Sequence, residues 1–321
     1  MLVRFGYVAM STVIPNASPS KTMTATSFAK ISDRDAAIRK LERIAAENLH
    51  NTLRLLRHNR ANDIHIYRFS SKLIPLFGHE LLKGWDPFPV LADDFANIGS
   101  YVREHHMRTG FHPDHFTVLS TPRKEVLESS YEVLDYHVRM LEAMGLDERA
   151  KCNIHIGGAY NDKAKTMTRF LQQFAAMSER IRSRIVLEND DKTFNALETL
   201  TACELLNVPM VLDIHHHAVN NNGESYSELW PRILATWKTQ NLPPKIHASS
   251  PKSEKDPRGH ADYLNAPDLI HFLNEIVEIT PELDVMIEAK MKDGALFRLM
   301  EDLHKEDNIH FIGQCSTNFS K

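Results

Sequence analysis

Residues 184–214 read RIVLENDDKTFNALETLTACELLNVPMVLDI, and this stretch decides the fold. Two short apolar runs, Arg184–Glu188 and Met210–Ile214, flank a segment of helical period at Asn195–Leu206. Runs rich in Val, Ile and Leu are typical of strands buried on both faces of a parallel sheet. Parallel strands also need a crossover connection, which the helical segment supplies. The stretch therefore predicts a strand–helix–strand unit.

The same unit recurs along the chain of 321 residues. Eight short apolar runs alternate with eight longer segments of helical period. The other strand candidates are Leu2–Ala9, Asp63–Phe69, Phe116–Ser120, Cys152–Ile156, Lys245–Ala248 and Asp284–Glu288. The other helix candidates are Asp33–Arg57, Asp93–Arg108, Glu125–Met144, Lys163–Ile181, Ser225–Trp237, Ala266–Ile279 and Gly294–Leu303.

This alternation predicts an α/β fold in which residues 1–321 form one (β/α)8 TIM-barrel domain. The alternative is an open doubly wound sheet, for which a Gly-rich turn after an early strand would be the expected nucleotide site. The turn after the first strand candidate, Met10–Pro15, contains no glycine. The barrel is therefore favoured.

Composition limits the classes of function. No apolar run approaches the roughly 20 residues that cross a bilayer, so we expect no membrane contact. Three widely spaced cysteines argue against a disulfide framework and for a cytoplasmic protein, nucleoid-associated in a prokaryote. A net charge of −4 and a pI of about 6.5 argue against a nucleic-acid coat protein. They leave room for a DNA enzyme, because bound metal ions reverse the sign of the local field.

Histidines and carboxylates gather at the predicted strand ends. In a barrel of this type the catalytic groups come from the C-terminal ends of the strands and from the loops after them. Nearly every such end carries an imidazole or a carboxylate here, and strand seven adds a lysine. In chain order these residues are His79, His112, His155, Glu188, Asp213, His215, His216, His217, Lys245, His247, His260 and Glu288, of which His112 lies just before the third strand candidate and His260 lies in the loop after the seventh.

Such a ring indicates a metal cluster at the C-terminal mouth of the barrel. Carboxylates crowded into one pocket repel one another unless cations neutralise them. Histidine nitrogen and carboxylate oxygen suit zinc, manganese or iron, and bridging carboxylates suit more than one ion. A single histidine at a strand end is more often structural, but eight coincidences at one rim favour metal binding. We interpret nine histidines elsewhere as structural: His50, His58, His65, His105, His106, His137, His271, His304 and His310.

Eight short motifs occur in a fixed order along the chain: YRFSS (67–71), HPDHF (112–116), HIGGAYNDK (155–163), LENDD (187–191), LDIHHH (212–217), KIHASS (245–250), GHADY (259–263) and IEAK (287–290). These motifs resemble those of the UV damage endonuclease family, and the resemblance covers nearly the whole chain. The barrel is also similar to that of endonuclease IV, the apurinic-site nuclease, and more distantly to that of xylose isomerase.

The resemblance implies two or three divalent ions, with Mn²⁺ expected and Zn²⁺ or Co²⁺ as alternatives. Glu188 would bridge two ions, and Glu188, Lys245 and His247 would be catalytic. Lys245 matches a position where the family carries a carboxylated lysine, which would serve as a further metal ligand. The remaining ligand positions are His79, His112, His155, Asp213, His216, His247, His260 and Glu288.

The resemblance also implies contacts with DNA. Tyr7 matches a family tyrosine near the end of strand one. The family probes the lesion with a Gln–Tyr pair, and here the pair is His115–Phe116, which lacks the tyrosine hydroxyl and leaves the lesion preference open. We expect Lys163 and the turn at Gly157–Gly158 to contact the phosphate backbone.

The resulting hypothesis is a metal-dependent hydrolase that cuts double-stranded DNA immediately 5′ to UV photoproducts, namely cyclobutane dimers and 6-4 photoproducts. Abasic sites are a further candidate substrate. We expect a monomer without an obligatory protein partner, because a monomer leaves the mouth open to duplex DNA. One alternative is a metal-dependent sugar isomerase or epimerase, which needs fewer metal ligands. Another is a non-enzymatic metal- or damage-binding protein, which has no need of bridging carboxylates.

Overall fold

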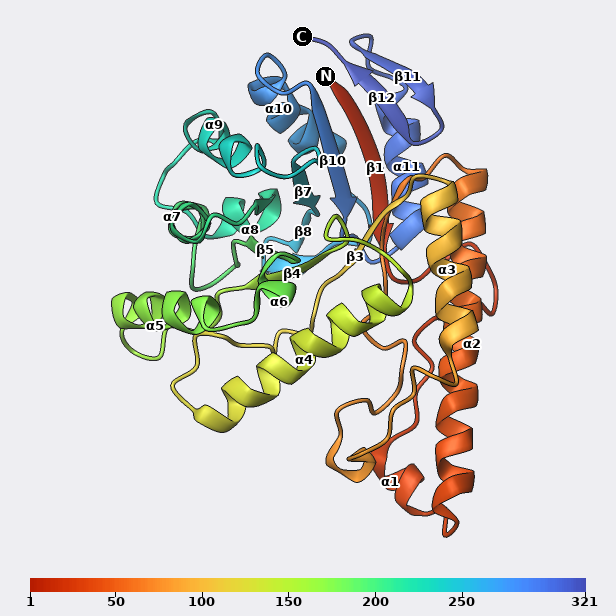
Figure 1. Cartoon of the computed structure of the whole chain (residues 1–321). Helices are drawn as coiled ribbons and strands as arrows, with labels where there is room; N and C mark the ends of the chain where they lie inside the picture. Colours follow the sequence, from red (N-terminus) through yellow and green to blue (C-terminus); the bar gives the residue numbers. More distant parts are fainter.

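Eight parallel strands close into a barrel in the computed structural model, which describes residues 1–321 (Figure 1). The first strand pairs with the second on one side and with the last on the other, which closes the ring. The predicted (β/α)8 barrel is thus confirmed. The barrel strands are β1 (Leu2–Val8), β2 (Ile66–Arg68), β3 (Arg108–Phe111), β4 (Lys151–His155), β5 (Ile185–Glu188), β6 (Met210–Asp213), β7 (Lys245–Ala248) and β10 (Glu282–Ile287).

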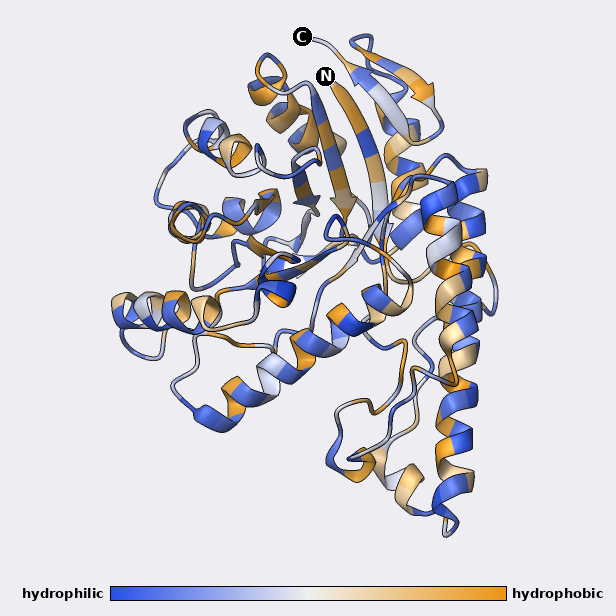
Figure 2. Cartoon of the chain, in the orientation of Figure 1, coloured by the Kyte–Doolittle hydropathy of each residue, from blue (hydrophilic) through white to orange (hydrophobic).

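Helices follow the strands and cover the outside of the barrel. Figure 2 shows hydrophobic and hydrophilic residues alternating along α2 and α4, as in helices with one buried face. The helices are α1 (Ala25–Ala29), α2 (Arg34–Ala61), α3 (Ala92–Glu104), α4 (Lys124–Ala143), α5 (Lys163–Ala175), α6 (Glu179–Arg182), α7 (Ala196–Leu206), α8 (Ile214–Val219), α9 (Tyr226–Thr236), α10 (Ala266–Ile276) and α11 (Lys292–Leu303), with a 3-10 turn, η1, at Glu80–Leu82.

Two hairpins supplement the barrel. The strands β8 (Pro251–Ser253) and β9 (Asp256–His260) form an exposed hairpin after β7. The strands β11 (Ile309–Gly313) and β12 (Ser316–Phe319) end the chain, and β12 pairs antiparallel with the first residues of β1. This pairing brings the two termini together at the end of the barrel where β1 begins (Figure 1).

The main core lies between the strands and the helices and contains 69 buried residues. A smaller apolar cluster of Val8, Ile66 and Met286 joins three neighbouring strands. At the N-terminal end of the barrel, Asp284 accepts hydrogen bonds from Arg4 and Arg108. The interior of the barrel therefore contains charged side chains, and these form ion pairs with one another.

The third strand is not where the sequence pattern predicts it. The predicted strand Phe116–Ser120 is loop and turn, and Phe116 is 74% exposed. The strand is β3 at Arg108–Phe111, so the predicted helix Asp93–Arg108 ends earlier, at Glu104. A search for apolar runs does not find β3, because three of its four residues do not have large apolar side chains. Arg108 contacts Asp284, and Gly110 allows the close approach of β4. A Cβ at Gly110 would lie 2.3 Å from the carbonyl oxygen of Lys151.

Other predicted elements match closely, with boundaries differing by a few residues. The predicted helix Lys163–Ile181 is two helices, α5 and α6, and the three histidines 215–217 lie in the short helix α8, directly after β6. All three cysteines are buried and free. None of the helices combines the length and the apolar character needed to cross a bilayer.

Candidate metal centre

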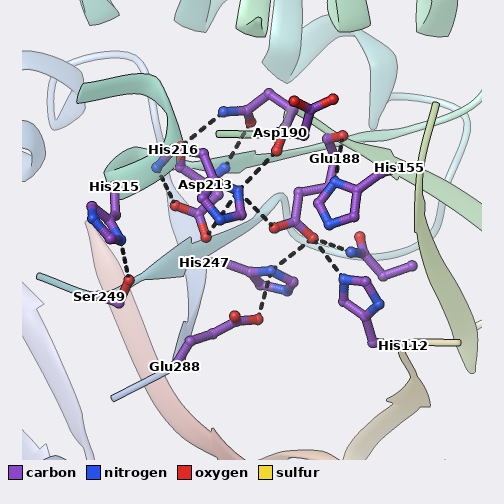
Figure 3. Close-up of polar contacts among 12 residues, drawn as sticks. His112, His155, Glu188, Asp190, Asp213, His215, His216, His247, Ser249 and Glu288 are labelled. Atoms are coloured by element: carbon purple, nitrogen blue, oxygen red, sulfur yellow. Dashed lines mark hydrogen bonds and ion pairs between the residues drawn. The ribbon is translucent and has the colours of Figure 1, made fainter. Parts of the chain in front are cut away.

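Seven imidazole and carboxylate side chains meet at the C-terminal mouth of the barrel (Figure 3). They come from six consecutive strands, because the carboxyl ends of parallel strands lie at one rim. Each is the last residue of its strand, lies within it near that end, or follows it closely. The residues are His112 after β3, His155 in β4, Glu188 in β5, Asp213 in β6, His216 in α8, His247 in β7 and Glu288 after β10.

Glu188 lies at the centre of this cluster. Its Oε2 atom is 3.0 Å from Nδ1 of His247 and 3.3 Å from Nε2 of His112. Its Oε1 atom is 3.5 Å from Nδ1 of His216. The side chain is buried, and Oε1 has no hydrogen-bond partner. A carboxylate in this position can share its two oxygens between neighbouring cations.

Two further carboxylates flank Glu188. Oδ1 of Asp213 accepts a hydrogen bond from the backbone N–H of His216 at 2.8 Å, while Oδ2 is buried without a hydrogen-bond partner and lies 3.6 Å from Nδ1 of His216. Oε1 of Glu288 lies 3.0 Å from Nδ1 of His247. Two buried carboxylates and a third that is largely buried need compensating positive charge within one mouth.

The donor atoms fall into three groups, each with the spacing of a metal site. In each group, one atom from each residue lies within 4.8 Å of the others. Glu188 belongs to all three groups. The groups are His112–His155–Glu188, Glu188–Asp213–His216 and Glu188–His247–Glu288. Nitrogen and oxygen donors of this kind, with orphaned carboxylate oxygens among them, fit divalent ions of borderline hardness.

The pKa shifts of the imidazoles also indicate that the carboxylates of the cluster favour positive charge nearby. Burial alone would lower the pKa of His216, but Asp213, Glu188 and Glu288 outweigh it and raise the pKa to about 9. For His247, burial is outweighed in the same way by Glu188 and Glu288, which also raise the pKa to about 9. Burial raises the pKa of Asp213. In the absence of metal, protons on imidazoles thus balance the carboxylates.

Backbone carbonyls orient several of the imidazoles. Nδ1 of His155 lies 3.2 Å from the carbonyl oxygen of Glu188, and Nδ1 of His216 lies 2.9 Å from that of Asn189. Nδ1 of His260 lies 2.8 Å from the carbonyl oxygen of Glu288. Such contacts fix the ring and the tautomer of a metal-ligating histidine. His260 is therefore oriented at the edge of the cluster, although it is in none of the three groups.

Two residues that support the carboxylates were missed in the sequence analysis. Arg68, at the end of β2, donates a hydrogen bond to Glu288 from Nη1. Asn153, in β4, donates from Nδ2 to Oε2 of Glu188. Arg68 lies within the motif YRFSS and Asn153 lies just before the motif HIGGAYNDK, but no residue-type rule distinguishes such partners from ordinary strand residues. Their pairing depends on which strands are neighbours across the barrel.

His79 lies outside the cluster. Its Nδ1 accepts a hydrogen bond from the backbone N–H of Leu81 at 3.2 Å, which caps η1. Its ring lines a different pocket, together with Trp85 and Tyr136. The loop that carries it packs toward α4 through the stacked rings of Phe77 and Tyr136, whose centroids are 4.2 Å apart. The structure therefore does not support the expectation that His79 is a ligand.

Tyr7 also lies away from the mouth. It is fully buried, and its hydroxyl donates to Oδ1 of Asn59 on α2 at 2.8 Å. Its ring packs against Tyr67 with the centroids 5.4 Å apart. Odd-numbered residues of β1 face the helices, so Tyr7 would have to leave the core to touch DNA. The structure therefore does not support the expectation that Tyr7 contacts DNA.

Lys245 begins β7 and lines a small cavity inside the barrel with Arg68, Arg108 and His247. Its ammonium group makes no hydrogen bond or ion pair. Burial and the guanidinium groups of Arg108 and Arg68 hold its pKa well below the ordinary value, against the opposing effect of Asp284. Lys245 thus lies beside the cluster but contributes to none of its ligand groups.

A groove of about 280 Å³ opens beside the cluster. His112, His155 and His216 line its inner part, and His115 lines its rim. Phe116 follows in the β3–α4 loop, with the rings of His115 and Phe116 at a centroid distance of 4.0 Å. Both predicted lesion-contacting side chains of this pair are therefore exposed at the mouth.

Lys163 is less available than the sequence suggests. Its ammonium group lies 2.7 Å from Oε2 of Glu198 and 5.4 Å from the ring centroid of Phe194. It begins α5 and belongs to the loop region after β4, so a phosphate would have to compete with Glu198. The contact of Lys163 with DNA stays a prediction.

A protein-family model described as "UV-endonuclease UvdE" matches residues 3–320 of this chain. The chain belongs to the UV-endonuclease family. A protein of Halalkalibacterium halodurans called UV DNA damage endonuclease is 47% identical over 321 residues, covering 100% of both chains. One of Bacillus cereus with the same name is 39% identical over 303 residues, covering 94% of this chain and 95% of that one.

Solved structures agree with this membership. The crystal structure of SacUVDE superposes with a TM-score of 0.83 at 29% identity and covers 94% of this chain and 98% of that chain. Endonuclease IV from Thermus thermophilus has a TM-score of 0.57 at 11% identity over 94% of this chain and 100% of that chain, which shows a shared fold alone. The resemblance that the motifs indicated is thus confirmed at the level of the family.

Proposed function

We propose that this protein is a metal-dependent endonuclease that cuts duplex DNA immediately 5′ to UV photoproducts. The observation that carries the proposal is the position of Glu188, which belongs to all three ligand groups at the mouth of the barrel. Membership of the UV-endonuclease family and the name of the relatives support the substrate class. Abasic sites are a second lesion class that the same site would accept.

The chain's own residues define where ions would bind. Three pairs of residues would each hold an ion together with Glu188: His112 and His155, Asp213 and His216, and His247 and Glu288. Divalent ions such as Mn²⁺ in these positions would supply Lewis-acid activation of water and neutralise charge on the phosphate. Asn153 and Arg68 hold two of the carboxylates in place. His260 completes the rim.

The reaction is hydrolysis of a phosphodiester. Water attacks the phosphorus and the bond to O3′ breaks, which leaves a 3′-hydroxyl and a 5′-phosphate. The groove beside His112 and His155 offers room for the phosphate. Straight duplex cannot bring this bond to the recessed mouth, so the DNA must bend and expose the damaged nucleotides. This exposure costs least where damage has already weakened pairing and stacking.

We further propose that Lys245 is carboxylated on its amine. An ammonium group without a partner, beside the guanidinium groups of Arg68 and Arg108, is unfavourable in a buried cavity. A carbamate is negatively charged, so the two guanidinium groups would attract it. It would also offer an oxygen atom as a metal ligand. Intact-protein mass spectrometry under bicarbonate should then detect a mass increase on Lys245 that a Lys245→Met variant lacks. An unmodified wild-type chain would contradict this part of the proposal.

A nicking assay on supercoiled plasmid tests the function. We expect the protein to nick UV-irradiated plasmid in the presence of Mn²⁺ and to lose this activity with a chelator. Undamaged plasmid should stay intact. Sequencing of nicked oligonucleotides with one defined photoproduct should place the cut 5′ to it. Turnover of a sugar without any nicking would instead favour an isomerase, and binding of damaged DNA without cleavage would favour a non-enzymatic role.

A further inference from the structure

The loop between β4 and α5 contains an unusual backbone. Tyr160 has φ 47° and Asn161 has φ 66°, and they are the one pair of adjacent non-glycine residues with left-handed φ values in the chain. Asparagine tolerates this region, but a bulky aromatic residue is rarely found there. Strain of this kind persists where the surrounding structure enforces it, and it occurs frequently at binding sites.

Contacts within the loop enforce its conformation. The carbonyl oxygen of Ala159 accepts hydrogen bonds from Oγ1 of Thr166 at 2.6 Å and from the backbone N–H of Asp162 at 3.1 Å. At Gly157, with φ 107°, a Cβ would lie 2.7 Å from side-chain atoms of the β3–α4 loop. The loop is thus packed tightly against its neighbour.

The ring of Tyr160 is held from one side. It stays 43% exposed, while the guanidinium carbon of Arg169 lies 5.4 Å from its centroid. Arg169 is itself fixed, because its Nε donates to the carbonyl oxygen of Ser120 at 2.6 Å and its Nη2 donates to Oγ1 of Thr166 at 3.0 Å. A cation stacked on an aromatic ring stabilises that arrangement. The ring of Tyr160 is thus held in one orientation while part of it stays exposed to solvent.

The position of this loop relates the ring to the metal centre. Three residues before Tyr160, Gly157 lines the same groove as His112 and His155. The exposed pair His115–Phe116 lies on the loop against which Gly157 packs. An aromatic platform beside a phosphate-binding groove is what a base displaced from a duplex can stack on.

We propose that Tyr160 is a stacking platform for a nucleobase of the damaged DNA, displaced from the helix as the phosphate enters the groove. The inference rests on the proposed endonuclease function and adds a binding residue to it. Stacking on an aromatic ring does not depend on base identity, so Tyr160 contributes to affinity for distorted DNA rather than to sequence preference. Its strained backbone is retained because it directs the ring outward.

Kinetics with a defined photoproduct duplex test this role. Replacing the ring in Tyr160→Ala should raise KM on the order of tenfold while kcat stays nearly unchanged, because a stacked base contributes to binding rather than to the chemical step. Tyr160→Phe and Tyr160→Trp should behave like the wild type. Ile312→Ala, a change at an exposed apolar residue on β11 at the opposite end of the barrel, serves as the control.

A second variant separates stacking from folding. Tyr160→Asn places a residue that tolerates positive φ at this position, so its Tm should equal or exceed that of the wild type. Its KM should nevertheless rise as in Tyr160→Ala. A fluorescent 2-aminopurine placed beside the lesion should be quenched by the wild type and by Tyr160→Phe, but not by Tyr160→Asn.

The outcomes distinguish this inference from the function on which it rests. Wild-type protein that neither nicks nor binds irradiated duplex would overturn the proposed function. Wild-type nicking together with an unchanged KM and unchanged quenching in Tyr160→Ala would overturn the stacking role alone. A lower Tm in Tyr160→Asn with normal KM would assign Tyr160 to the fold instead.

Discussion

Glu188 is the residue on which the site depends, because three groups of donor atoms share its two oxygens. We expect Glu188→Gln, which keeps the size of the side chain but removes its charge, to lower nicking of irradiated DNA by ~100-fold or more. This expectation follows because even outer partners of metal ligands change activity or metal affinity 10–100-fold. Nicking rates at saturating Mn²⁺ measure the effect. Glu254→Gln, on the exposed hairpin tip, is the matched control, and equal rates for both variants would refute the bridging role.

Arg68 is the second residue whose role can be tested by itself. Its hydrogen bond to Glu288 holds a carboxylate that also faces His247. We expect Arg68→Leu to weaken Mn²⁺ binding on the order of 10–100-fold in isothermal titration calorimetry, with the folded state preserved. Arg298→Leu, on the outside of α11, should leave the affinity unchanged. Equal affinities in the wild type and Arg68→Leu would show that Glu288 needs no such support.

At the scale of elements, a side chain at Gly157 in the β4–α5 loop should lower the stability of the fold. Alanine there would add positive-φ strain and a clash at 2.7 Å with Ser120 and Val118. We expect the free energy of unfolding to fall by about 1–3 kcal/mol, measured by denaturant titration. Gly223→Ala is a matched control, because its φ is also positive at 98° but no atom lies within 4 Å of the added Cβ. A larger loss at Gly223 would argue against tight packing of the loop.

Acid should lower the stability of the protein because His137 is buried on α4. Burial lowers the pKa of this ring from 6.5 to about 4, although its Nδ1 lies 2.7 Å from the carbonyl oxygen of Val133. At a pH between these two pKa values, His137 is protonated in the unfolded chain but not in the folded chain. The free energy of unfolding therefore falls as the pH drops from 6.5 toward 4. The loss is on the order of 3 kcal/mol.

His137→Phe should therefore flatten the dependence of unfolding free energy on pH over this window. His271→Gln, at an exposed position on α10, should retain the wild-type slope. Identical slopes for His137→Phe and the wild type would mean that other groups cause the acid sensitivity.

Sequence patterns predicted the barrel from the alternation of apolar runs and helical segments, and they predicted most of the cluster from the residues at the ends of those runs. Glu188, Asp213 and His247 lie at or near the carboxyl ends of apolar runs, and parallel strands bring such ends to one rim. The third strand was missed because neither Arg108, which contacts Asp284 across the barrel, nor Gly110, which allows the close approach of β4, raises its apolar content. The placements of Tyr7 and His79 depend on which side of a strand or loop faces the mouth, which local pattern does not determine.

The whole molecule should be stabilised by the ions that we propose for the cluster. The ligands come from six strands, so the site forms only in the folded barrel. Binding restricted to the folded state should add about 2.7 kcal/mol when free Mn²⁺ exceeds its Kd by about 100-fold. Differential scanning calorimetry should then record a higher Tm with Mn²⁺ than with chelator. The Glu188→Gln variant should lose most of this difference, and an equal difference in both proteins would contradict coupling through Glu188.

Anomalous diffraction from crystals grown with Mn²⁺ tests the central claim most directly. We expect two or three anomalous peaks at the mouth of the barrel, with carboxylate oxygens of Glu188 within bonding distance of at least two of them. Histidine nitrogens from His155, His216 or His247 should complete the coordination. Crystals that contain Mn²⁺ but show no peak within bonding distance of Glu188 would contradict the metal centre and the proposed nuclease with it.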